Sequence, residues 1–295
     1  MLCGIYGMVV NAIIIMKKYL RILLAMSVIS LLSSCVGDKS QNNDTILNDS
    51  TANEKSEEQI VFESPDLRWK DLSGHVKRCV IKRFSAFKRD SVYVAKSVDP
   101  ESYDTIYFNR KGQVERIVMW TNFDGEDLLI QNTTLVYDDN GECVEGYDLL
   151  SHDEALNVSL GRNEEGYITS LLRLRPDEDV VVFGDEVEWT DNRISKYTYI
   201  EYDMSSTWQR KYNPEGRLIE EQSLYVSVEE GGESNLKYGY VAVDSFGNWT
   251  ERYIINEYVN IDYNVETGRE TRMTQPLTYF VERREIEYFD EKSEQ

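Results

Sequence analysis

The amino-acid sequence predicts an all-β protein: an antiparallel β-meander of hairpin repeats that form a curved open sheet or a partial barrel. A polar turn that ends in glycine recurs along the chain. The residues beside these turns alternate between apolar and polar, as in strands with two different faces. The 20 tyrosines suit a sheet, because a tyrosine ring can cover it while the hydroxyl reaches water. No long window has a helical period.

The chain begins with a segment that predicts export. A short apolar run, Ile22–Leu32, follows three basic residues, Lys17, Lys18 and Arg21. This order is typical of a secretory signal peptide, and the run is shorter than the about 18 apolar residues of a membrane span. Residues 1–15 lie upstream of the basic residues. A translation start at Met16 would leave an ordinary signal, so residues 1–15 are interpreted as a mis-assigned start.

The apolar run ends in Leu32-Ser33-Ser34-Cys35. A cysteine directly after small residues resembles the bacterial lipoprotein signal, in which the cysteine is lipidated and becomes the first mature residue. The resemblance implies that residues 1–34 are removed and that Cys35 carries the lipid. It also implies a place in the cell envelope, anchored to the outer membrane, with the periplasmic and exterior faces both left open.

The segment from 35 to 59 follows as a polar stretch of small and acidic residues with almost no aromatic side chain. Such a segment cannot bury enough apolar surface to offset its ordering entropy. We therefore expect a disordered tether between the lipidated cysteine and the folded domain, which is predicted to span residues 60–295.

About six similar units are expected in this domain. In each, a polar turn with glycine follows an aromatic or β-rich run, and Asn or Asp before glycine is typical of a tight turn with positive φ. The turn glycines are separated by 29, 25, 50 and 31 residues. The gap of 50 holds two units if the glycine-free segment Trp189–Ile194 is a further member. A recurring unit of this length indicates a repeat architecture, in which hairpins that are marginal alone bury a shared face. The turn glycines are Gly112, Gly141, Gly166, Gly216 and Gly247.

The unit Tyr212-Asn213-Pro214-Glu215-Gly216-Arg217-Leu218 is similar to the YD repeats of the RHS family. The segments 71–77, 244–252 and 285–288 look like recurring elements of YD-repeat (RHS-like) Bacteroidetes lipoproteins. This resemblance covers residues 67–289 and implies a β-repeat fold in the cell envelope. Large RHS proteins build a closed shell from many repeats, so about six units favour an open sheet.

Composition excludes several classes of function. The formal net charge is −21, and removal of the three basic residues of the signal makes it about −24. Such an acidic protein is not expected to bind nucleic acid, which is recognised through cationic contacts to phosphate. Only two histidines are present, His75 and His152, and no phosphate-binding loop or nucleophile motif occurs. We expect no cofactor and no metal site, and we interpret the acidic segments 177–179 and 185–188 as solvated turns.

Two cysteines, Cys79 and Cys143, follow Cys35 in the chain. They can pair in an oxidising compartment, but sequence spacing does not show whether their Cα atoms approach closely enough. The alternatives are a disulfide and two buried free thiols.

Aromatic residues near the strand ends are the candidate binding residues. They can stack on sugars or anchor a partner protein, or they can simply fill a sheet face. The sequence therefore favours a lipid-anchored, non-enzymatic binding or structural module for a protein or glycan partner. The alternative is a glycan-acting hydrolase that uses paired carboxylates, which would need a cleft with two close, buried acids. The candidate binding residues are Trp120, Trp189, Trp208 and Trp249.

Overall fold

The computed structural model describes residues 62–290, except 150–154, 177–179, 202–203, 228–229, 265–266 and 268. The predicted signal peptide, the lipidation at Cys35 and the tether lie outside these residues. Within the described part, no helix has the length and apolar character needed to cross a membrane.

The described chain forms one short helix, α2 (Pro65–Trp69), and 16 strands of a single sheet. The strands are β1 (Val76–Arg89), β2 (Val92–Ala95), β3 (Ser102–Phe108), β4 (Val114–Phe123), β5 (Glu126–Tyr137), β6 (Cys143–Leu149), β7 (Ala155–Arg162), β8 (Ile168–Leu174), β9 (Val181–Thr190), β10 (Arg193–Glu201), β11 (Met204–Tyr212), β12 (Leu218–Val226), β13 (Glu230–Val243), β14 (Trp249–Asn264), β15 (Arg269–Thr274) and β16 (Thr278–Tyr288).

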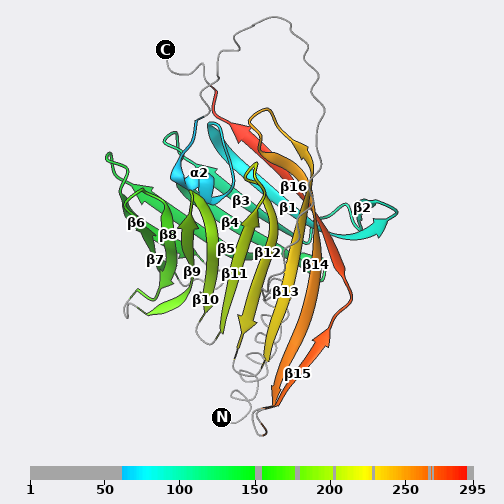
Figure 1. Ribbon diagram of the computed structural model, residues 1–295. Coiled ribbons are helices and arrows are strands. Elements are labelled where there is room, and N and C mark those ends of the chain that lie inside the picture. The colour runs from blue at the N-terminus through cyan, green and yellow to red at the C-terminus, as the bar shows by residue number, and fades with distance from the viewer. Residues whose placement is uncertain are drawn as a thin grey trace, which may run out of the picture.

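The sheet closes on itself (Figure 1). Strand β1 pairs with β3, and strands β3 to β13 pair in chain order. The ring is completed because β13 pairs with β14 and β16 lies between β14 and β1. These pairings make an antiparallel ring of 14 strands, with β2 and β15 attached outside it. The all-β class agrees with the sequence, but the prediction of a curved open sheet or partial barrel is wrong. The C-terminal strand bonds to the first strand, and a closed ring leaves no edge unpaired.

Six turns lie at one end of the barrel, here called the rim. Five of them have one geometry, in which an Asn or Asp side-chain oxygen accepts the backbone N–H four residues later at 2.8–3.0 Å. In each, the glycine three residues after the Asn or Asp has φ between 75° and 88°. The sixth turn has no glycine, and Asp191 and Asn192 take positive φ instead, as these residue types tolerate. The five first residues are Asn109, Asp138, Asn163, Asn213 and Asp244.

Aromatic residues near the rim tie neighbouring strands together. The Tyr137 hydroxyl donates to the Val114 carbonyl at 2.8 Å, and the Trp189 Nε1–H donates to the Ile168 carbonyl at 2.7 Å. Tyr212 and Tyr240 make the same kind of bond to Ile194 and Leu218. In every case the acceptor begins, or nearly begins, the preceding strand, so these four aromatic residues fix the register between neighbouring strands near the rim.

A plug formed by residues 62–75 closes the barrel at the rim. Ser64 caps α2 by accepting the Leu67 N–H at 3.1 Å, and Pro65 follows in the first helical turn, both favourable at a helix start. Leu67 is fully buried in the main core cluster, together with Trp69 and Leu72. The apolar core therefore lies between the plug and the strand ends at the rim.

Buried polar contacts hold the plug to the wall. The Asp66 carboxylate, 1% exposed, accepts the Val114 N–H at 2.9 Å and pairs with both terminal nitrogens of Arg162. The Ser64 hydroxyl donates to the Gly112 carbonyl at 2.7 Å. A Cβ on Gly112 would lie 2.7 Å from the Ser64 hydroxyl oxygen, so this turn needs glycine for its close contact with Ser64 as well as for its positive φ.

Candidate binding site in the barrel lumen

Packing against the plug identifies the inward face of each strand. Cys79, Ile106 and Ile117 are cross-strand neighbours, and all three belong to the core cluster of Leu67. Because strand side chains alternate between two faces, every second residue from these positions faces the interior of the barrel, here called the lumen. Farther from the rim the inward positions become polar and charged.

The ring has more strands than the barrels whose interiors are filled by side chains. Barrels of about eight strands are filled by side chains, whereas those of about 16 to 18 strands leave an aqueous channel. With 14 strands, this barrel is near the wider class, and the plug fills its rim end. Arg83 and Arg210 point inward, yet 41% and 24% of their side-chain surfaces remain exposed. Water therefore reaches the polar part of the lumen.

Arg173 is the centre of the first charged cluster. It is 1% exposed, and its guanidinium contacts Asp148 at 3.3 Å and Asp185 at 3.0 Å. The Thr133 hydroxyl donates to Asp148, and the Tyr197 hydroxyl donates to Asp185. Burial, reinforced by the Asp185 charge, raises the pKa of Tyr197 well above its usual value. The cluster is thus fully bonded and fixed in place.

Glu282 is the centre of the second cluster. Its carboxylate, 2% exposed, lies 2.6 Å from a guanidinium nitrogen of Arg83 on one side and of Arg252 on the other. Burial opposes ionisation, but the two arginines outweigh it and lower the pKa of Glu282 to about 2. A third pair, Arg210 and Glu221, is joined at 2.7 Å. Together the clusters form a belt of paired charges around the lumen.

Two further lumen groups titrate near neutral pH. Burial lowers the pKa of Lys70 to about 8, against the favourable charges of Asp185 and Asp104. Burial also raises the pKa of Asp104 to about 6, and the nearby Glu282 charge adds to this effect. The Lys70 Nζ atom lies 3.6 Å from the centre of the Trp69 ring. The charge of the lumen therefore changes between pH 6 and pH 8.

Aromatic rings line the lumen beside the ion pairs. Trp208 meets the Tyr197 ring edge-on at 5.0 Å between centroids, and Phe183 and Tyr199 lie 6.4 Å apart. The Arg252 guanidinium lies 4.6 Å from the centre of the Tyr238 ring. Fixed donors, fixed acceptors and ring faces together are the composition expected of a small-ligand site.

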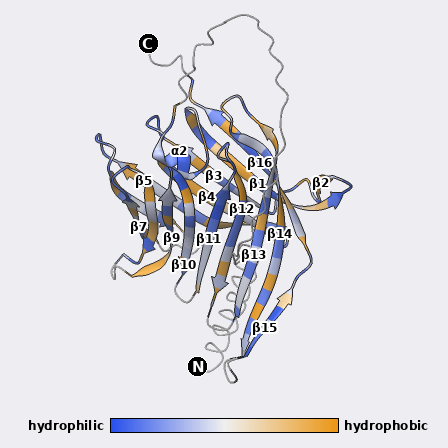
Figure 2. Ribbon diagram, in the orientation of Figure 1, coloured by the Kyte–Doolittle hydropathy of each residue, from blue (hydrophilic) through white to orange (hydrophobic). Residues whose placement is uncertain are grey.

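The outer wall also carries paired charges, but these pairs are exposed. Exposed Lys–Glu pairs join neighbouring strands, among them Lys237 with Glu257 at 2.7 Å near the middle of β13 and β14. Lys196 pairs with Glu188 at 2.6 Å, and Figure 2 shows hydrophilic residues interspersed with hydrophobic ones along the strands. A lipid-embedded barrel carries an outward apolar band at mid-height, so this wall is suited to contact with water.

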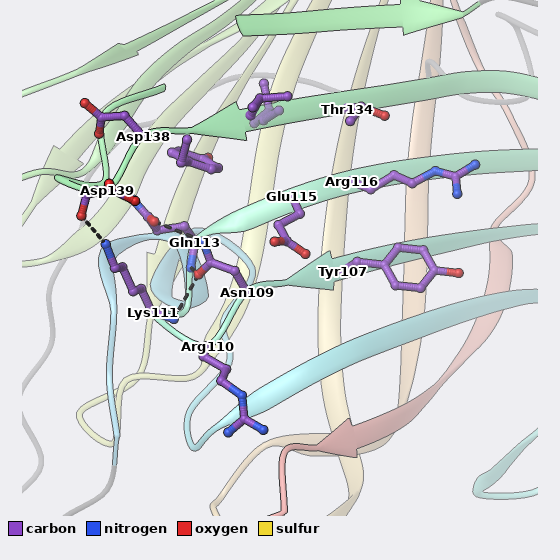
Figure 3. Close-up of a pocket in the computed structure, with 13 residues that line it drawn as sticks. Tyr107, Asn109, Arg110, Lys111, Gln113, Glu115, Arg116, Thr134, Asp138 and Asp139 are labelled. Atoms are coloured by element: carbon purple, nitrogen blue, oxygen red, sulfur yellow. Dashed lines mark hydrogen bonds between the residues drawn. The ribbon is translucent and has the colours of Figure 1, made fainter. Parts of the chain in front are cut away.

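A groove of about 820 Å³ lies on the outer wall beside two rim turns (Figure 3). The Lys111 Nζ atom donates to the Asp139 carbonyl at 2.8 Å, and Gln113 donates to the Gly141 carbonyl at 2.7 Å. Arg116 donates to Asn132 at 3.0 Å. These contacts are exposed or half-buried, whereas the Arg173 contacts in the lumen are buried, so the groove is a weaker candidate than the lumen.

The four candidate tryptophans do not share a face. Trp189, Trp208 and Trp249 face the lumen, where Trp189 and Trp208 contact the core and Trp249 is 3% exposed. Trp120 lies on the outer wall and stacks on Tyr103 at 6.2 Å.

The structure also locates the two cysteines of the folded domain and the acidic segment 185–188. Cys79 is a buried free thiol and Cys143 a half-buried one. The segment 185–188 is part of β9, not a solvated turn: Asp185 faces the lumen, and Glu188 lies on the outer wall with Lys196.

Sequence reasoning missed the charged belt. Arg173 follows Ile168 and Leu171 on the inward face of β8, and Glu282 precedes Ile286 on that of β16. The signal that could have revealed the belt is a charged residue an even number of positions from buried apolar residues of the same strand, since such residues share one face.

No protein-family model and no curated protein matches this chain. Among solved structures, the chain is similar to a porin-like protein from Bacteroides uniformis, with 12% identity, 72% of this chain and 96% of that chain covered, and a TM-score of 0.36. It is also similar to a chain of the TcdB2-TccC3-Cdc42 structure, with 12% identity, 65% of this chain covered and a TM-score of 0.29. The similarity spans 12% of that second chain. A closed all-β barrel is compatible with a location in the outer membrane or elsewhere in the cell envelope.

Proposed function

We propose that this protein is a lipid-anchored envelope module of the YD-repeat kind that binds a glycan in its lumen without altering it. The observation that carries the proposal is the belt of paired charges and aromatic rings inside a barrel that is plugged at its rim. Such a belt offers directional hydrogen bonds and stacking faces in one enclosed space.

The charge balance of the belt favours a polyhydroxyl ligand over a strongly charged one. Arg173 is matched by two carboxylates, Glu282 by two arginines, and Arg210 by Glu221. A sugar presents hydroxyl groups that both donate and accept, together with C–H faces that pack on aromatic rings. The bonded ion pairs hold the lumen donors and acceptors in position before binding, which lowers the entropy cost of association.

Two features support an anchored position in the envelope, and a third supports the repeat kind. Cys35 follows a signal-like segment, and the polar stretch after it can act as a tether. The outer wall carries exposed ion pairs suited to water. Five rim turns repeat one geometry, as expected for related repeat units.

The hydrolase alternative rests on one observation. Asp104 and Glu282 face the same lumen, and their pKa values are about 6 and about 2, a separation typical of an acid and a base pair. Arginines, however, occupy both oxygens of Glu282, which leaves it poorly placed to attack or activate water. Binding is therefore the function that the geometry supports best.

Calorimetric titration of the mature protein with a panel of oligosaccharides tests the proposal. We expect Trp208→Ala, on the lumen face, to abolish the heat of binding, and Trp120→Ala, on the outer wall, to leave it unchanged. Loss of binding in Trp120→Ala alone would contradict a lumen site. New reducing ends in the titrated mixture would support the hydrolase instead.

A further inference from the structure

Arg284 is a buried cation whose bonds differ from those of the other inward arginines. It is 8% exposed, and its two terminal nitrogens donate to the backbone carbonyls of Asp71 at 2.9 Å and Lys70 at 2.7 Å. Its Nε–H group has no acceptor among the residues that the structure describes. The inward arginines that do bond a carboxylate are Arg83, Arg162, Arg173, Arg210 and Arg252.

Trp249 supplies a second buried donor at the same place. Its ring centre lies 3.7 Å from the Arg284 guanidinium carbon and 4.0 Å from that of Arg252. The side chain is 3% exposed, and its Nε1–H also lacks an acceptor within the described part of the chain. Two buried N–H groups that need an acceptor thus belong to side chains that contact each other.

Trp249 also departs from the pattern of the repeat. Each of the other rim turns is followed by a small or aliphatic residue that fills the core, and an indole occurs only here. The residues at the comparable positions are Val114, Cys143, Ile168, Ile194 and Leu218. Packing does not require an N–H donor at this position.

Arg284 is less well paired than the arginines beside it. Both oxygens of Glu282 bond Arg83 and Arg252, whereas Arg284 bonds backbone carbonyls and feels the Asp71 and Glu282 charges from a distance. The neighbouring Cys79 cannot compensate, because burial raises the pKa of its thiol and keeps it neutral. A buried charge is stable only when it is paired and hydrogen-bonded.

We propose that Arg284 and Trp249 bind a single small anion of the halide class beneath the plug. Both side chains are at least nine-tenths buried, which favours a small ion over a glycan at this end of the lumen. Because Arg284 also bonds the carbonyls of Lys70 and Asp71, the anion stabilises the attachment of the plug to the wall.

Thermal unfolding at constant ionic strength tests this site. Replacing gluconate by chloride or bromide should raise the Tm of the mature protein by a few degrees in a saturable way. Trp249→Phe keeps the ring but removes the donor, and we expect it to lose this response. Trp120→Phe, an outer-wall control, should keep it. An equal response in Trp249→Phe, or none in the wild type, would overturn the proposal.

Diffraction from crystals soaked in sodium bromide gives a test that does not depend on variant stability. We expect an anomalous bromine peak within hydrogen-bonding distance of Arg284 Nε and Trp249 Nε1. Density without an anomalous signal would mean that a water molecule satisfies both donors, and the anion site would be refuted.

Discussion

Acid sensitivity of the Glu282 cluster follows directly from its geometry. The carboxylate is 2% exposed between Arg83 and Arg252, and its pKa is lowered from 4.5 to about 2. Because the folded state holds the proton more weakly than the unfolded state, this group stabilises the fold above pH about 4.5. That stabilisation is lost as the pH falls toward 2. A difference of about 2.5 pKa units corresponds to about 3 kcal/mol.

Urea unfolding of the wild type and Glu282→Gln between pH 2 and pH 7 measures this contribution. At pH 7 we expect the variant to lose about 3–5 kcal/mol, because Arg83 and Arg252 lose the buried carboxylate that they share. Its unfolding free energy should also fall less steeply below pH 4.5. Glu285→Gln, at an exposed outward position on the same strand, should behave like the wild type. A wild-type pH slope in Glu282→Gln would refute the assignment.

Three more substitutions test the plug, the lumen and a rim turn by urea unfolding at pH 7. Asp66→Ala should lose about 3 kcal/mol, because Arg162 loses its carboxylate and the Val114 N–H loses its acceptor. The exposed Glu63→Ala should lose almost nothing, and equal losses would contradict the role of Asp66. Asp104→Asn should gain about 1–2 kcal/mol, because burial disfavours the ionised form of Asp104 and raises its pKa from 3.8 to about 6. The stability of the wild type therefore falls as the pH rises through that interval. A loss of stability in the variant would mean that the ionised form is needed. Gly112→Ala should lose about 2–3 kcal/mol and Gly247→Ala about 1 kcal/mol. Both glycines have positive φ, but only a Cβ at position 112 would meet a close neighbour, Ser64. Equal losses would mean that the contact with Ser64 does not matter.

The local part of the fold could be predicted from the sequence. Each rim turn is specified by an Asn or Asp whose side chain bonds the backbone four residues later, followed by a glycine with positive φ. Even the glycine-free turn at Asp191 and Asn192 could be located from the repeat spacing. These interactions act within five residues, so a short sequence window contains them.

Closure could not be predicted in the same way. It depends on pairing between β1 and β16, for example Cys79 with Ile286, and no local pattern marks residues so distant in sequence. The two faces of each strand are also hard to tell apart, because inward Arg173 and outward Lys211 are both charged. For that reason the sequence left open whether the candidate tryptophans bind a partner or fill a sheet face, and three of the four face the lumen.

The central claim is that the ligand binds inside the barrel, and a crystal structure of the mature protein with a bound oligosaccharide tests it most directly. We predict sugar density in the lumen, stacked on Trp208 and hydrogen-bonded to the belt around Arg173 and Glu282. Density confined to the outer wall, near Trp120 or the groove at Arg116, would contradict the account.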